Sequence, residues 1–271
     1  MIPDSIDERF SRNIGIFSEH EQKKLANVSI AIAGAGGVGG LLAERLVRIG
    51  VGKIKLTDPG TFEHSNCNRQ YACNEMTING FKAKIVSEDI QRINPGADII
   101  FDTKGIHTQE DADEFVEGAD IIIDEMDYGL FNQSIALQRA ARNNGKYYMF
   151  SSAIGFGGLA VLFAPKSCTL EEFNGLEPDK ELSEITQPSL DPQKVLPMIP
   201  GYLKKSEQLM MEIIREERPV TTNSIGVGVT SIITANEAIN LILKKAKIIT
   251  APEYIYIDLV DGIFKRGSNI S

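Results

Sequence analysis

The chain has 271 residues, of which 42% are hydrophobic and 24% charged, a composition typical of a globular protein with one large α/β domain or one domain with an insertion. Its net charge of −9 argues against nucleic acid as the main partner but is compatible with a small basic protein. No apolar run approaches the roughly 20 residues of a membrane span and no signal peptide is visible, so we expect a cytoplasmic protein with no membrane partner.

The first 27 residues form a polar segment ahead of the first expected strand. Ser5 with Glu8, and Ser18 with Glu21, have the spacing of a capping box, which predicts two short helices. Arg12 lies between the two boxes, and taken alone it is best interpreted as a solvated arginine.

The stretch 28–58 carries the clearest pattern in the chain. An apolar run from Val28 predicts a buried parallel strand, a glycine turn follows it, and an amphipathic run up to Gly50 predicts a helix. Lys53–Thr57 is the next expected strand, and Asp58 stands at its carboxyl end. This order is typical of a nucleotide-binding unit, because glycines let the backbone approach a phosphate and the acid accepts hydrogen bonds from a ribose. The glycines of the turn are Gly34, Gly36, Gly37 and Gly39.

Strands and helices go on alternating to about residue 150, which predicts a doubly wound, Rossmann-like, mostly parallel sheet. The later expected strands cover 98–103, 119–124, 146–151 and 157–164, and the helices begin near 82, 108 and 131. A long apolar helix at 223–245 and an antiparallel strand pair at 253–266 follow. The expected organisation is an N-terminal helical segment (1–27), a nucleotide-binding domain (28–164), an inserted crossover segment with a helix at 204–217 (165–222), and a C-terminal helix and strands completing the same domain (223–271).

Several polar side chains fall at the carboxyl edge of this predicted sheet, where open parallel sheets bind ligands. Arg69 and Lys82, together with glycine N–H groups, can cradle phosphates, and Asp127 can hold Mg²⁺. A nicotinamide cofactor needs only the glycines and the acid, so this set favours ATP with Mg²⁺. Each residue taken singly could instead be a turn cap, a helix cap or a solvated charge. Their concentration at one edge favours a binding site.

The chain resembles the ThiF/MoeB/HesA family, the bacterial relatives of ubiquitin-activating enzymes. The motifs that carry the resemblance occur in the same order between residues 9 and 127, and GGLAVLFAP with the small-residue helix after Thr222 extends it to most of the chain. These motifs are RFSRN at 9–13, GAGGVG at 34–39, GVGKIKLTD at 50–58, SNCNRQ at 65–70, Lys82 ahead of RINP at 92–95, and DEMD at 124–127.

The resemblance implies an ATP-dependent adenylyltransferase that forms an acyl-adenylate on a C-terminal carboxylate and releases pyrophosphate. The implied substrate is a small ubiquitin-like or sulfur-carrier protein, or a precursor peptide, and the implied assembly is a homodimer. The resemblance implies that Gly37 contacts the nucleotide and Asp58 the ribose. It implies base, ribose and phosphate contacts for Asn66, Arg69 and Lys82, with Asn68 and Gln70 close by. Asp127 would bind magnesium, and Arg12 would contact the ATP of the neighbouring subunit.

The chain departs from the family pattern at its cysteines and after Asp127. Many relatives hold zinc with two C-x-x-C pairs, but Cys67, Cys73 and Cys168 form no such pair, so we expect no structural zinc and a reduced compartment. Cys168 is the candidate for a thioester with the activated carboxylate, and a bystander thiol is the competing interpretation. Tyr128 stands where the family often has asparagine, which leaves that position without a predicted role.

Three other functions stay open on the sequence alone. One is an adenylating tRNA-modifying dehydratase of the same family, which the acidic charge disfavours. Another is a nicotinamide-dependent oxidoreductase, against which Arg69, Lys82 and Asp127 argue. The last is a catalytically silent dimer partner, which would tend to lose those same three residues.

Overall fold

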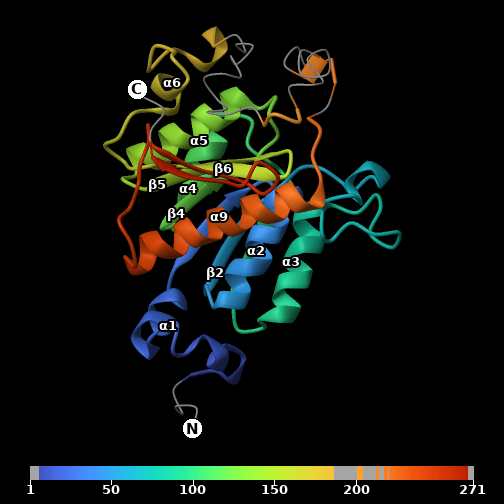
Figure 1. Cartoon of the computed structure of the whole chain (residues 1–271), viewed down its shortest axis with the longest axis vertical. Helices are drawn as coiled ribbons and strands as arrows, with labels where there is room; N and C mark the ends of the chain where they lie inside the picture. The colour runs from blue at the N-terminus through green and yellow to red at the C-terminus, as the bar shows by residue number, and fades with distance from the viewer. Residues whose placement is uncertain (1–5, 186–199, 204–211, 214–216, 219, 268–271) are drawn as a thin grey trace.

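The computed structural model describes residues 6–185, 200–203, 212–213, 217–218 and 220–267. Its strands are β1 (Ser29–Ala33), β2 (Lys53–Thr57), β3 (Asp98–Asp102), β4 (Ile121–Asp124), β5 (Tyr147–Ile154), β6 (Gly157–Phe163), β7 (Tyr254–Asp258) and β8 (Ile263–Gly267). They form one sheet in the order β3-β2-β1-β4-β5-β6-β7-β8 (Figure 1). Pairing is parallel from β3 to β5 and antiparallel from β5 to β8, which confirms the predicted fold class.

The helices cover both faces of this sheet. They are the 3-10 helices η1 (Glu8–Asn13), η2 (His64–Asn66) and η3 (Leu182–Glu184), and the α-helices α1 (Glu19–Leu25), α2 (Gly37–Ile49), α3 (Lys82–Ile93), α4 (Gln109–Val116), α5 (Phe131–Asn143), α6 (Leu170–Phe173) and α9 (Ser224–Leu243). Helices α2, α3 and α9 lie on one face, and α4 and α5 lie on the other (Figure 1). The expected helix at 204–217 falls largely outside the described residues.

The strand β1 shows why the sheet needs helices on both faces. Ile30 and Ile32 point into the core under α2, α3 and α9, while Ala31 and Ala33 point into the core under α4 and α5. All four side chains are fully buried, because successive side chains of a strand alternate between its faces. An uninterrupted apolar run is therefore what a central parallel strand requires.

The helix α9 is the longest of the described helices and packs against α2 and across β5 and β6. Asn223 caps it, accepting hydrogen bonds from the N–H groups of Ile225 and Gly226 at 2.9 and 3.1 Å. By length and composition alone it could cross a membrane, contrary to the expectation that no run comes close. However, 72% of the most apolar 18-residue stretch of α9 is buried inside the molecule, as in the core helix of a folded domain.

The N-terminal segment packs at the end of the sheet where α2 finishes (Figure 1). The capping box of Ser18 and Glu21 is present, as predicted. Ser5 lies outside the described residues, and the cap of η1 is Asp7, whose carboxylate accepts the Arg9 N–H at 2.9 Å. The domain boundaries drawn from the sequence stay predictions.

Candidate functional site

The order of strands puts a topological switch point between the carboxyl ends of β1 and β4, because the connections from these strands turn to opposite sides of the sheet. Open α/β sheets bind ligands at such a point, and the glycine turn lies there. Gly34 has φ +100°, and a Cβ there would lie 2.3 Å from the Glu125 carbonyl oxygen. A Cβ on Gly39 would lie 2.0 Å from the Gly34 carbonyl oxygen. These two glycines therefore serve close packing of the turn.

The other two glycines of the turn face side chains. A Cβ on Gly37 would meet Val227 of α9 at 3.2 Å and the Arg69 Cγ at 3.6 Å. A Cβ on Gly36 would meet the Gln70 amide nitrogen at 3.7 Å. The structure thus brings the SNCNRQ segment against the first turn of α2, where helix N–H groups are free to receive an anion.

Asp58 ties the end of β2 to the glycine turn. One carboxylate oxygen accepts the Ala35 N–H at 2.7 Å and the other accepts the Gly60 N–H at 2.7 Å. Burial raises the pKa of Asp58, against the opposing effect of these hydrogen bonds and of Lys82. Each oxygen keeps a further lone pair, so Asp58 can hold the turn and still accept a hydrogen bond from a ligand.

Two opposite charges lie near Asp58 with no partner inside the described parts of the chain. Lys82 Nζ and the Asp127 carboxylate both act electrostatically on Asp58, yet neither has a hydrogen bond or an ion pair. A Cβ on Gly60 would lie 3.0 Å from Asp58 Oδ1 and 3.4 Å from Lys82 Nζ, so the Asp58 carboxylate and the Lys82 ammonium group are close together beside Gly60. Asp127 is exposed beyond the end of β4.

The polar segment 65–70 is folded by its own hydrogen bonds. Asn66 is buried, and its Oδ1 accepts the Glu63 N–H at 3.1 Å. Arg69 donates to the Ser65 carbonyl at 3.1 Å and to Asn68 Oδ1 at 3.0 Å. Gln70 is 5% exposed, and its amide oxygen has no hydrogen-bond partner among the described residues.

The start of α9 belongs to the same site, and the sequence analysis missed it. Asn68 donates its side-chain N–H to the Thr222 carbonyl at 3.0 Å, and Val227 packs over Gly37. Neither the buried Thr222 hydroxyl nor the buried Gln70 amide oxygen has a hydrogen-bond partner in the part of the chain that the structure describes. The cap residue Asn223 was the available signal, but it marks only the beginning of a helix and not where that helix docks.

The two acids ahead of Asp127 are held inside the fold. Asp124 accepts the Met126 N–H at 2.9 Å and the Tyr148 hydroxyl at 2.6 Å, and burial raises its pKa. Glu125 accepts the Ser151 hydroxyl at 2.5 Å, and burial raises its pKa well above the ordinary value. These contacts fix the loop that carries Asp127.

Arg12 lies far from the glycine turn of its own chain. Asn13, beside it in η1, donates to the carbonyl of Ile49 at 3.1 Å. Ile49 ends α2, whose 13 residues span about 20 Å from the glycine turn. Of the apolar residues beside Arg12, Phe17 packs on the chain's own core. Ile16 alone among them is strongly exposed, at 74%.

Cys168 is not at this edge either. It follows Ser167, whose carbonyl accepts a hydrogen bond at 2.7 Å from Arg142 in the last turn of α5. Asp127 precedes the first turn of that helix, so Cys168 and Asp127 lie near opposite ends of α5. Burial raises the pKa of the Cys168 thiol. The described residues contain no group of three or more His, Cys, Asp or Glu side chains that could hold a metal. The absence of structural zinc stays a prediction, which elemental analysis tests.

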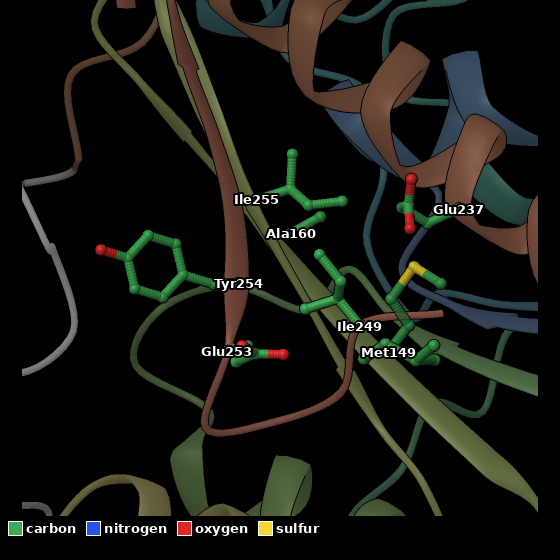
Figure 2. A pocket seen from close by; sticks show the side chains of 8 residues that line it. Met149, Ala160, Glu237, Ile249, Glu253, Tyr254 and Ile255 are labelled. Atoms are coloured by element: carbon green, nitrogen blue, oxygen red, sulfur yellow. The ribbon is translucent and has the colours of Figure 1, made fainter. Parts of the chain in front are cut away.

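A small cavity of about 10 Å³ lies between α9 and the sheet, away from the glycine turn. Figure 2 shows Glu237 reaching from α9 toward Met149 and Ile249, with the ring of Tyr254 pointing away from them. Glu237 follows Val227 by ten residues of helix, about 15 Å, and pairs with Arg266 at 3.1 Å. The cavity has room for about one water molecule, so it is no nucleotide site.

Comparison with known proteins decides the family. The sequence model of the ThiF family matches residues 10–268. The chain belongs to the ThiF family. The curated relatives of this ThiF-family chain include the sulfur carrier protein ThiS adenylyltransferase of Bacillus subtilis (strain 168), 32% identical over 148 residues, which cover 54% of this chain and 43% of that protein. The tRNA threonylcarbamoyladenosine dehydratase of the same strain is 35% identical over 120 residues, 44% of this chain and 47% of that protein.

These matches span less than half the length of either relative. Solved structures resemble the ThiF-family chain over nearly its whole length. The crystal structure of E. coli MccB with ATP has a TM-score of 0.73 and 18% identity, covering 98% of this chain and 74% of that one. PaaA has a TM-score of 0.72 and 15% identity, with 98% and 75% covered. At such identities the likeness establishes the fold alone.

Proposed function

We propose that this ThiF-family protein uses ATP with Mg²⁺ to adenylate the C-terminal carboxylate of a small ubiquitin-like carrier protein or of a precursor peptide, with release of pyrophosphate. The observation that carries the proposal is the pair of opposite charges, Lys82 and Asp127, which lie near Asp58 at the glycine turn and have no hydrogen bond or ion pair among the described side chains. A cation and a carboxylate gathered near one point suit a polyphosphate and its metal ion.

The residues present fit such a nucleotide. The Gln70 amide oxygen, beside Gly36, and the Thr222 hydroxyl, in the residue that Asn68 contacts, are buried polar atoms without partners among the described residues, as expected where a polar ligand completes a site. The family match and the ATP in the MccB structure, which shares the fold, support the same ligand. A single free carboxylate is also what Mg²⁺ needs when phosphates and waters supply its other ligands.

Each residue then has a defined task. Arg69, Lys82 and the N–H groups at the start of α2 would hold phosphate oxygens, and Asp58 would accept hydrogen bonds from the ribose. Asp127 would hold Mg²⁺. Bound ATP supplies an electrophilic phosphorus for the substrate carboxylate and pyrophosphate as the leaving group. The chain's contribution is to hold the reacting groups in place and to offset the charge that develops on the phosphates.

Two measurements test this proposal. Calorimetric titration with ATP and Mg²⁺ should show binding, and the same titration with NAD should show none. Pyrophosphate exchange into ATP should then require a carrier protein ending in Gly-Gly or a short peptide with a free C-terminus. NAD binding in the absence of ATP binding would refute the proposal in favour of the nicotinamide-dependent alternative.

One second candidate has an observation in its favour. The Bacillus subtilis tRNA threonylcarbamoyladenosine dehydratase matches this chain about as well as the ThiS adenylyltransferase does. The net charge of −9 disfavours a tRNA substrate. Exchange stimulated by modified tRNA, and by no protein or peptide, would select this alternative.

We further propose a homodimer in which Arg12 serves the partner's site. Arg12 is exposed and stands about 20 Å along α2 from its own glycine turn, so it cannot act there. Arg12→Ala and Asp127→Ala should each be inactive alone. Mixing them under exchange conditions should restore up to about half of the sites of a normal dimer, because one site of a mixed dimer keeps both residues. Full activity of Arg12→Ala, or no recovery on mixing, would contradict the shared site.

A further inference from the structure

Cys67 and Cys73 have no part in the site described above, although they lie within the segment that carries four of its residues. Their sulfur atoms are 3.2 Å apart. The segment reaches this shape through successive turns: the Gln70 N–H donates to the Asn66 carbonyl at 2.9 Å, and the Cys73 N–H donates to the Gln70 carbonyl at 2.9 Å. The spacing C-x5-C is thereby folded into a facing pair of thiols.

The two thiols differ in solvent exposure, so that an oxidant can reach one of them before the other. Cys67 is exposed, while Cys73 is 8% exposed and donates its thiol hydrogen to the Glu63 carbonyl at 3.4 Å. Burial, with the neighbouring Cys67, raises the pKa of Cys73 to about 11. Lys82 and Arg69 act electrostatically on Cys73 as well, which places the pair next to the cations of the candidate site.

We propose that Cys67 and Cys73 are a redox modification site that closes to a disulfide and weakens nucleotide binding. The oxidant class is a low-molecular-weight disulfide. The Cys67 thiolate attacks one of its sulfurs, which forms a mixed disulfide and releases one small thiol. Cys73 then gives up its proton and attacks Cys67 Sγ, which releases the second small thiol. Two protein thiols are oxidised and one small disulfide is reduced to two thiols.

The effect on the site follows from the geometry and rests on the proposed function. A disulfide holds its sulfur atoms at about 2 Å, so the pair closes by roughly 1 Å. This closure pulls on the turn that carries Asn68, Arg69 and Gln70, and it removes the hydrogen bond from Cys73 to Glu63. Since weakening one hydrogen bond from a charged group such as Arg69 lowers ligand affinity on the order of tenfold, we expect ATP to bind about tenfold more weakly after oxidation.

The test uses the full chain incubated with glutathione disulfide and then with excess dithiothreitol. Peptide mapping by mass spectrometry should find Cys67 joined to Cys73, in wild type and in Cys168→Ser alike. Calorimetry should show weaker ATP binding after oxidation and recovery after reduction. Cys67→Ser and Cys73→Ser should show no change of ATP affinity on the same treatment.

Three results would overturn the proposal. They are a stable glutathione adduct on Cys67 with no internal disulfide, pairing with Cys168 instead, and a Cys67–Cys73 disulfide that leaves ATP affinity unchanged. Failure of the reduced protein to bind ATP would count against the proposed function, and the peptide map would still decide whether the pair closes.

Discussion

The two ends of α2 differ in whether the charged side chains near them are paired. At its carboxyl end, where the N-terminal segment packs, Glu21 pairs with Lys245 at 2.7 Å, and Gln22 donates to the Ile49 carbonyl at 2.8 Å. At its amino end, Lys82 and Asp127 are left without partners in the described structure. The difference separates an end of α2 where charged and polar groups are paired from an end where Lys82 and Asp127 are available to a ligand.

Asp127→Ala should give the largest effect, because it removes the carboxylate that we propose as the magnesium ligand. Pyrophosphate exchange should fall by about two orders of magnitude or more, since a lost metal ligand costs several kcal/mol of transition-state stabilisation. The melting temperature should not move, because an exposed loop carboxylate contributes little to the fold. Asp113→Ala, an exposed acid on α4, is the control, and equal exchange in the two variants would remove Asp127 from the mechanism.

Lys82→Ala tests the cation of the same pair. A lost hydrogen bond to a charged group costs about 1.5–3 kcal/mol, so the Kd for ATP should rise about tenfold to a hundredfold in calorimetry. Lys84, two residues further along α3, is exposed and lies 4.0 Å from Glu88. Lys84→Ala should bind ATP normally, and a matching loss there would mean that general charge, not position, matters.

Tyr148→Phe tests the buried support beneath the site. Its hydroxyl donates to Asp124 at 2.6 Å, and both residues are buried, so the variant leaves a carboxylate oxygen short of a donor. We expect a loss of about 1–3 kcal/mol in the free energy of unfolding, measured with urea. Tyr71→Phe, at a partly exposed ring, should stay within about 0.5 kcal/mol of wild type. Equal stability of both variants would contradict the structural role of the Asp124 contact.

Glu21→Gln should give the smallest effect, at the paired end. Lys245, and then the Ser18 N–H, lower the pKa of Glu21 from 4.5 to about 2. A lowered folded-state pKa stabilises the fold above the unfolded value of about 4.5, and this contribution is lost as the pH falls toward 2. Urea unfolding should show that wild type is more stable than the variant at pH 6, that the difference in the free energy of unfolding shrinks as the pH falls toward 2, and that it is smaller in high salt. A difference that grows as the pH falls would have the wrong sign.

The sheet could be predicted from the sequence because each strand and helix carries its own local pattern of apolar and polar residues. The apolar run of β1 requires burial on both faces, and carboxyl ends of parallel strands share one edge, so Asp58 and Asp127 had to come near each other. The same argument gathers Lys82, because α3 begins at that edge. The predicted roles of these side chains stay predictions, whereas their shared location is now observed.

What the sequence could not supply is contact between distant segments. The meeting of Thr222 with Asn68 and of Val227 with Gly37 depends on how α9 docks, and no local pattern encodes that. The distance of Arg12 from its own glycine turn has the same origin. The facing of Cys67 and Cys73 depends on turns between them that contain neither glycine nor proline, the usual signals of a turn.

The late position of α9 has a consequence for how the protein is made. Asn68 and Thr222 are 154 residues apart in sequence, so the ribosome finishes most of the sheet before the helix that completes the site emerges. Until then the part of α2 that faces α9 stays uncovered, since α9 supplies Ala235, Ala238 and Ile239 to the core it shares with α2. Contacts of such high sequence separation form slowly, so the nascent chain passes through a stage with bare apolar surface. We expect this stage to be the one at which chaperones bind, and translation arrested before Ser224 to yield a chain that stays bound to them.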